Sequence, residues 1–151
     1  MVLTTDSKFN PINILMVEDN RADVRLVKEV LREGKIYVNL IVAEDGEEAI
    51  AYLRKEDKYK DVELPDLILL DLNMPKKSGH ELLDDMKGDN NLKHIPVIVM
   101  TVSNAEEDVL KSYNLHANAY IVKPVELDQF IIAVKSIENF WLTIVKLPPK
   151  L

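Results

Sequence analysis

Carboxylate side chains follow two of the apolar segments of the chain, at the point where each segment ends. Glu18 and Asp19 come directly after "INILMV" (12–17), and Asp71 comes directly after "DLILL" (66–70). Carboxylates held close together repel one another, so either one of them takes up a proton or a cation joins them. Oxygen ligands without histidine or cysteine suit a hard divalent ion such as Mg²⁺. Such an ion leaves open positions for a phosphoryl group.

Two further polar side chains stand at the ends of apolar segments. Thr101 ends "PVIVMT" (96–101), and Lys123 follows "AYIV" (119–122). Each alone has an ordinary explanation, because threonine often ends a strand and lysine usually points into water. In an open parallel sheet, however, ligands bind outside the carboxyl ends of the strands. We therefore expect these side chains to converge with the carboxylates if the segments form neighbouring parallel strands.

The rest of the chain predicts the elements that would bring these residues together. Apolar segments rich in Val, Ile and Leu alternate with helical patterns five times, and such βα alternation predicts a parallel sheet covered by helices on both faces. The expected fold is a three-layer, doubly wound α/β domain. The expected strands are 12–17, 38–43, 66–70, 96–101 and 119–122, and the expected helices are 21–33, 46–54, 79–87, 105–113 and 126–141.

Three local patterns add detail to this prediction. Ser103 or Asn104 can cap the helix at 105–113, where "AEED" supplies carboxylates to the first turn. The charged segment 55–65 predicts a solvated loop. One buried stripe is expected on the last helix, formed by Leu127, Phe130, Ile131, Val134, Ile137 and Trp141.

Composition narrows the class of protein. A chain of 151 residues that is 47% hydrophobic can bury one sizeable core, so we expect a single domain. The absence of cysteine suits a reducing cytoplasm. A net charge of -7 argues against a nucleic-acid partner, because phosphates would be repelled. No apolar run approaches the roughly 20 residues that span a bilayer, so no membrane partner is expected.

Four motifs in order give the chain a family resemblance. "VEDN" follows the first strand, "LLDLNMP" the third, and "VIVMT" and "YIVKP" cover the fourth and fifth. Together they resemble the receiver domain of two-component response regulators over about residues 12–140. The resemblance implies a flavodoxin-like sheet of order 2-1-3-4-5. It also implies a phosphorylatable regulator that signals through protein contacts, and no enzyme beyond taking part in its own phosphorylation and dephosphorylation.

The resemblance also implies roles for the residues at the strand ends. Asp71 would accept a phosphoryl group from a sensor histidine kinase. Glu18, Asp19, Asp71 and the main-chain carbonyl of Asn73 would hold Mg²⁺ or Mn²⁺, Glu18 through water. Lys123 would pair with a phosphoryl oxygen.

Further residues match positions where the family switches or tunes its signal. Thr101 would donate its hydroxyl to the phosphoryl group, and Tyr120 would turn inward to fill the space that Thr101 vacates. Asn73 and Ser103 occupy positions that tune the lifetime of the aspartyl phosphate. The Lys123-Pro124 peptide is commonly cis in receivers, and the sequence leaves its isomer open. His116 stands where glycine is common and is expected in a left-handed conformation.

The C-terminal segment predicts an interface or self-packing. "FWLTIVKLPPKL" places Phe140, Trp141 and Leu142 at the end of a minimal receiver, where exposed apolar residues mark an interface. We expect residues 1–11 and 141–151 to be extensions of a receiver at 12–140. "DLNMPKKSG", "LHANAY" and "FWLTIVKLP" resemble the single-domain regulators that partner phytochrome-type histidine kinases, which implies a possible homodimer.

Three other functions compete with this interpretation. A haloacid dehalogenase-type phosphatase also uses an aspartate after a strand, but it needs a second carboxylate two positions later, where Asn73 stands. A flavodoxin-like cofactor binder needs a phosphate loop after the first strand, and Glu18 and Asp19 would repel that phosphate. A receiver fold that serves only as a constitutive docking module remains open.

Overall fold

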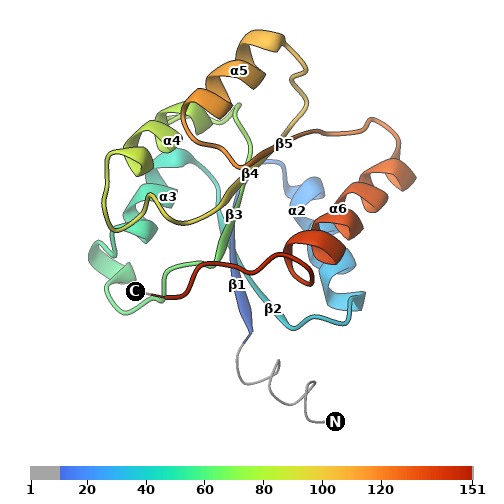
Figure 1. Cartoon of the computed structure of the whole chain (residues 1–151), viewed down its shortest axis with the longest axis horizontal. Coiled ribbons are helices and arrows are strands. Elements are labelled where there is room, and N and C mark those ends of the chain that lie inside the picture. Colours follow the sequence, from blue (N-terminus) through green and yellow to red (C-terminus); the bar gives the residue numbers. More distant parts are fainter. Residues whose placement is uncertain (1–10, 151) are drawn as a thin grey trace.

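The computed structural model describes residues 11–150 as five parallel strands between two layers of helices (Figure 1). The sheet order is β2-β1-β3-β4-β5, so the predicted doubly wound topology is confirmed. The predicted extension at 1–11 lies outside the described residues except for Pro11. The strands are β1 (Ile12–Val17), β2 (Val38–Ala43), β3 (Leu67–Leu70), β4 (Val97–Thr101) and β5 (Ala119–Val122), and the helices are α2 (Arg21–Glu33), α3 (Gly46–Leu53), α4 (Gly79–Lys87), α5 (Glu106–Asn114) and α6 (Leu127–Trp141).

The two faces of the sheet carry separate hydrophobic clusters, which explains why the strands are apolar without alternation. In β3, Ile68 and Leu70 pack on the side of α3 and α4, while Leu67 and Leu69 pack on the side of α2 and α6. All four side chains are at most 2% exposed. A strand covered on both faces needs an apolar residue at every position. The same covering makes β3 a rigid support for the residue that follows it.

Strand register fixes which residues meet at the carboxyl end of the sheet. Val17 pairs with Leu70, so the segments that leave β1 and β3 start side by side. The main-chain N–H of Asp71 donates to the carbonyl of Val17 at 3.0 Å. On the far side of β4, Thr101 pairs with Val122. Residues that follow four of the strands are therefore brought to one edge.

Most helix starts follow the sequence, but α5 does not. Its N-cap is Ala105, which has no side chain able to cap, so the prediction that Ser103 or Asn104 caps this helix is wrong. The Ser103 hydroxyl instead donates to the side chain of Asp108 at 2.5 Å and accepts from the N–H of Ala105 at 3.3 Å. A hydrogen bond from the Ser103 hydroxyl to Asp108, in the first turn of α5, therefore takes the place of an N-cap.

Two other local predictions need correction. Leu127 is 57% exposed and does not belong to the buried stripe of α6, whereas Phe130, Val134 and Ile137 are buried. The charged segment 55–65 contains a short 3-10 helix, Asp57–Tyr59, and its Tyr59 ring packs edge-on against Tyr52 with centroids 5.2 Å apart. This loop is therefore partly packed against the core.

Three features of the described backbone answer questions left by the sequence. His116 has a φ of 71°, which confirms the left-handed conformation expected of it. The Lys123-Pro124 peptide is trans, since residues 11–150 contain no cis peptide bond. In the same range no helix combines the length and the apolar character that crossing a bilayer requires.

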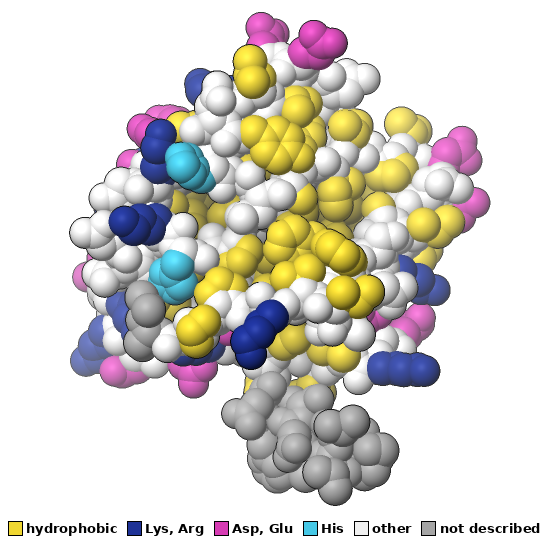
Figure 2. Space-filling model, in the orientation of Figure 1, with side chains coloured by type: hydrophobic (Ala, Val, Ile, Leu, Met, Phe, Trp, Pro, Cys, Tyr) yellow, Lys and Arg dark blue, Asp and Glu magenta, His cyan; other side chains and the backbone are white. Residues whose placement is uncertain are grey.

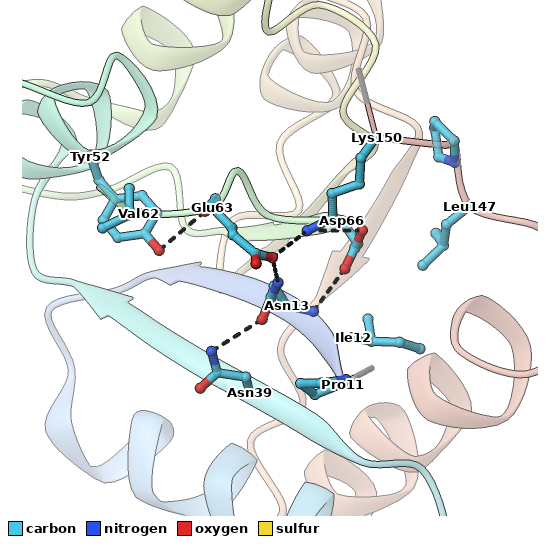
Figure 3. Close-up of a pocket in the computed structure, with 11 residues that line it drawn as sticks. Pro11, Ile12, Asn13, Asn39, Tyr52, Val62, Glu63, Asp66, Leu147 and Lys150 are labelled. Atoms are coloured by element: carbon cyan, nitrogen blue, oxygen red, sulfur yellow. Dashed lines mark hydrogen bonds and ion pairs between the residues drawn. The ribbon is translucent and has the colours of Figure 1, made fainter. Parts of the chain in front are cut away.

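The C-terminal segment folds back across the amino ends of the strands, at the opposite end of the sheet from Asp71. Leu142 is 7% exposed and packs with the α2 and α6 cluster, so of the two expectations for this segment Leu142 follows self-packing. Trp141 packs partly against that cluster, and Phe140 stays 52% exposed. Further on, Lys150 lies beside a hollow of about 830 Å³ (Figure 3). Its Nζ donates to the carbonyl of Leu64 at 3.0 Å and lies 3.3 Å from a carboxylate oxygen of Glu63.

Two glycines offer a test of how closely α4 abuts the end of β3. A Cβ at Gly79 would lie 2.5 Å from the carbonyl oxygen of Asp71 and 2.7 Å from the Cα of Leu72, and these backbone atoms cannot yield cheaply. We expect Gly79→Ala to lower the free energy of unfolding by about 1–3 kcal/mol. Urea denaturation measures this change.

Gly88→Ala is the matched control, because a Cβ there would approach nothing closer than 3.9 Å. Gly88 has φ -82°, which alanine adopts freely, so this variant should keep or gain stability, by about 0.4–1 kcal/mol. Equal stability of the two variants would contradict the close approach.

Candidate functional site

Three carboxylates meet at the carboxyl edge of the sheet, and we name Glu18, Asp19 and Asp71 the acidic corner. Each offers an oxygen, and these oxygens all lie within 4.8 Å of one another. Glu18 is 2% exposed and Asp71 is 8% exposed, whereas Asp19 is exposed. The predicted convergence of these residues therefore holds in the structure. Their oxygen-only composition and spacing fit a hard divalent cation.

The Lys123 side chain reaches the acidic corner from the end of β5. Its Nζ donates to Glu18 Oε1 at 2.5 Å and lies 3.3 Å from Asp71 Oδ2. The side chain is 6% exposed, so the ion pairs lie largely out of water. Its buried position depends on the carboxylates, because an unpaired buried ammonium would be strongly destabilising.

A fourth carboxylate, Asp23, also contacts Lys123, and this residue was not predicted from the sequence. Asp23 lies in the first turn of α2, and its Oδ2 accepts from Lys123 Nζ at 2.8 Å. The signal available was its place three residues after the helix cap Asn20, whose side chain accepts from the N–H of Asp23 at 3.1 Å. That position turns Asp23 back toward the strand ends.

The pKa values of Glu18 and Lys123 reflect this crowding. Burial raises the pKa of Glu18 to about 7; the hydrogen bond from Lys123 opposes this shift and the charge of Asp71 adds to it. Burial alone would lower the pKa of Lys123, but its hydrogen bonds to Asp23 and Glu18 more than reverse that effect and raise the pKa. Lys123 therefore stays charged, yet one ammonium does not neutralise the three carboxylates of the acidic corner. A cation would complete the neutralisation.

The Thr101 hydroxyl is buried without a partner. Thr101 is 0% exposed, and its Oγ1 finds no hydrogen-bond partner among the described residues. Its carbonyl accepts from the N–H of Lys123 at 2.7 Å, which ties the ends of β4 and β5 together. An unpaired buried hydroxyl costs free energy, so a strongly accepting group bound nearby would relieve it.

The other predicted site residues, Asn73, Tyr120 and Ser103, lie around the acidic corner. The main-chain N–H of Asn73 donates to Asp71 Oδ1 at 3.2 Å, and the Asn73 side chain is exposed. The Tyr120 hydroxyl donates to the carbonyl of Ser103 at 2.9 Å, which attaches the half-buried ring to the loop between β4 and α5. Tyr120 and Ser103 thus form a unit beside the site.

The fold and this site define a class of protein. Residues 14–135 match the response regulator receiver domain family. The chain belongs to this family: it is a phosphoacceptor domain of two-component signal transduction.

Individual relatives agree with this assignment. Response regulator Rcp1 of Synechocystis sp. is 46% identical over 144 residues, which cover 95% of this chain and 98% of Rcp1. A crystal structure of the Mn²⁺-bound form of Rcp1 has a TM-score of 0.90 at 47% identity, covering 92% of this chain and 100% of that one. A structure of the phosphorylated cyanobacterial phytochrome response regulator RcpA has a TM-score of 0.88 at 48% identity, covering 91% and 98% of the two chains.

Family membership decides between the functions left open by the sequence. The predicted resemblance to phytochrome-associated single-domain regulators is confirmed, and the chain is a signalling protein of the response regulator class. The haloacid dehalogenase and flavodoxin-like cofactor interpretations are accordingly set aside.

Thr101→Val tests the unpaired hydroxyl. Valine has nearly the same shape but no polar group, so we expect the free energy of unfolding to rise by roughly 0.5–1.5 kcal/mol. Thr143→Val is the control, because the Thr143 hydroxyl donates to the carbonyl of Glu138 at 3.1 Å and its removal should bring no gain. Urea denaturation of both variants gives the comparison. A clear loss of stability in Thr101→Val would mean that its hydroxyl is satisfied.

Proposed function

We propose that Asp71 accepts a phosphoryl group from the phosphohistidine of a sensor histidine kinase. The proposal rests on one observation above all: the Asp71 carboxylate lies at the edge of the sheet, within 4.8 Å of Glu18 and Asp19 oxygens and beside the Lys123 ammonium. Phosphoryl transfer needs positioning and charge neutralisation more than covalent chemistry. This corner supplies both.

The transfer forms one bond and breaks one. A carboxylate oxygen of Asp71 attacks the phosphorus, the P–N bond to the imidazole of the kinase breaks, and that nitrogen keeps the electron pair and takes up a proton. Lys123 pairs with an oxygen of the resulting acyl phosphate. The unpaired hydroxyl of Thr101 donates to another.

A divalent cation belongs to this site. Glu18, Asp19, Asp71 and the main-chain carbonyl of Asn73 would hold Mg²⁺ or Mn²⁺, Glu18 through water. Support comes from the spacing of the three carboxylates and from the Mn²⁺-bound form of Rcp1. When bound, the ion neutralises charge on the phosphoryl oxygens. Asn73 and Ser103 tune the lifetime of the acyl phosphate, and the domain takes part in its own dephosphorylation.

The signal leaves the domain through protein contacts on the side of α5, β5 and α6. Thr101 turns toward the phosphoryl group, and Tyr120 fills the space that it leaves, which shifts the population of two states of this face. Figure 2 shows hydrophobic side chains gathered across the middle of the view, between α5 and α6. Exposed hydrophobic residues on these elements include Leu110, Tyr113, Val122 and Leu127, and Val125 is exposed in the loop between β5 and α6.

The partner of this receiver is a phytochrome-type histidine kinase in the cytoplasm. The similarity to RcpA, described as a phytochrome response regulator, supports this choice. We further propose that the domain forms a homodimer through the exposed part of its C-terminal region. Phe140 and Ile144 are 52% and 72% exposed there, and their apolar area suits an interface.

Asp71→Asn tests the acceptor. Incubation of the wild-type protein with acetyl phosphate and Mg²⁺ should add one phosphoryl group that hydroxylamine removes, as intact-mass spectrometry would record. Asp71→Asn should lose the label because an amide is a poor nucleophile. The control Asp84→Asn changes an exposed aspartate of α4 and should label like the wild type. If the wild-type protein takes up no phosphoryl group from acetyl phosphate or from a histidine kinase, the result would instead favour a constitutive docking module.

Variants at Phe140 and Leu142 distinguish a residue of the proposed dimer interface from a residue that stabilises the fold. Phe140→Ser should reduce the dimer fraction in light scattering and leave the free energy of unfolding of the monomer nearly unchanged, because the side chain is half exposed. Leu142→Ala should lower that free energy by about 2–4 kcal/mol, because the side chain is 7% exposed. An identical mass for Phe140→Ser and the wild type, at a concentration where the wild type is dimeric, would remove Phe140 from the interface.

A further inference from the structure

Lys123 and a divalent cation depend on the same two carboxylates. The ammonium lies 2.5 Å from Glu18 Oε1 and 3.3 Å from Asp71 Oδ2, and both residues belong to the acidic corner. A cation drawn to those oxygens therefore competes with Lys123 for their charge. If Lys123 had no other partner, each positive group would weaken the binding of the other.

Among residues 11–150, Asp23 is the one side-chain partner of Lys123 that is outside this competition. Its oxygen lies 2.8 Å from Lys123 Nζ. Asp23 does not belong to the acidic corner, whose three carboxylate oxygens lie close enough together to hold one cation. The start of α2 fixes its place, because the Asn20 side chain caps the helix through the N–H of Asp23. Its side chain is 19% exposed, so water screens this ion pair only in part.

We propose that Asp23 is a positioning residue that retains Lys123 when Glu18 and Asp71 engage a divalent cation. With Asp23 present, the ammonium keeps a carboxylate partner beside Asp71, and the metal and Lys123 occupy the site together. Both positive groups then face a phosphoryl group on Asp71. This role rests on the proposed function, since it assumes that the acidic corner binds the cation.

Loss of the Asp23 charge should therefore weaken cation binding, because Lys123 then relies only on the ligands of the metal. Isothermal titration calorimetry with Mn²⁺ measures the affinity. We expect Asp23→Asn to weaken binding by roughly two- to tenfold more than the control. Asp45→Asn is that control: Asp45 lies at the same edge of the sheet, 15% exposed, and its carboxylate pairs with Lys76 at 3.6 Å. Asparagine keeps the helix cap that Asp45 provides, so this variant measures the loss of one nearby charge.

A double-mutant cycle shows whether Asp23 acts through Lys123. In a Lys123→Met background, Asp23→Asn should weaken Mn²⁺ binding no more than Asp45→Asn does. An equal effect of Asp23→Asn with and without Lys123 would overturn the proposal. So would equal affinities of Asp23→Asn and Asp45→Asn.

A second measurement needs no Lys123 variant, which guards against a variant that fails to fold. In the Mg²⁺-loaded protein, the ammonium protons of Lys123 should stay protected from exchange in NMR spectra, and Asp23→Asn should abolish that protection. Unchanged protection in Asp23→Asn would refute the retaining role.

The outcomes also separate this inference from the proposed function. A wild-type protein that binds neither Mn²⁺ nor Mg²⁺ would overturn this inference together with the metal part of the proposed function. Normal binding with no difference between the variants would overturn this inference alone.

Discussion

Mutual repulsion of carboxylates at one edge of a parallel sheet is the constraint on which the rest of this structure depends. Because Val17 pairs with Leu70, Glu18 and Asp71 follow adjacent strand ends and lie close together. Burial removes the water that would screen their charges. Lys123 offsets part of that repulsion, but burial, with an added contribution from the charge of Asp71, still raises the pKa of Glu18. The site thus has an excess of negative charge that a divalent cation would neutralise, and the bound cation would in turn favour a phosphoryl group.

The scaffold around the acidic corner is built to resist this repulsion. β3 is buried on both faces, and α4 begins so close behind it that only glycine fits at position 79. The main chain that carries Asp71 is therefore fixed from the strand side and from the helix side. Thr101 and Tyr120 differ, because one has an unpaired hydroxyl and the other is tied to a loop carbonyl. The proposed phosphoacceptor thus lies on the rigid part of the site, and the residues proposed as the switch lie on its less constrained part.

The sequence predicted those features that depend on nearest neighbours along the chain. The bounds of β1, α2, β2, α4 and β5 follow from apolar runs and caps, and the strand ends predicted the acidic corner. What it could not predict depends on contacts between distant segments. Asp23 and Lys123 are 100 positions apart, and Leu142 is buried in a cluster with residues of α2, which lie far from it in the sequence. Local patterns carry no information about such distant contacts.

The return of the C-terminal segment also has a consequence for engineering. Pro11, Leu147 and Lys150 line one hollow at the amino ends of the strands, away from the acidic corner. A short peptide could therefore link Lys150 to Pro11 in a circularly permuted chain, with new termini opened in a surface loop. For the same reason, a sensor chip or a fluorescent protein attached at Lys150 would leave the acidic corner accessible.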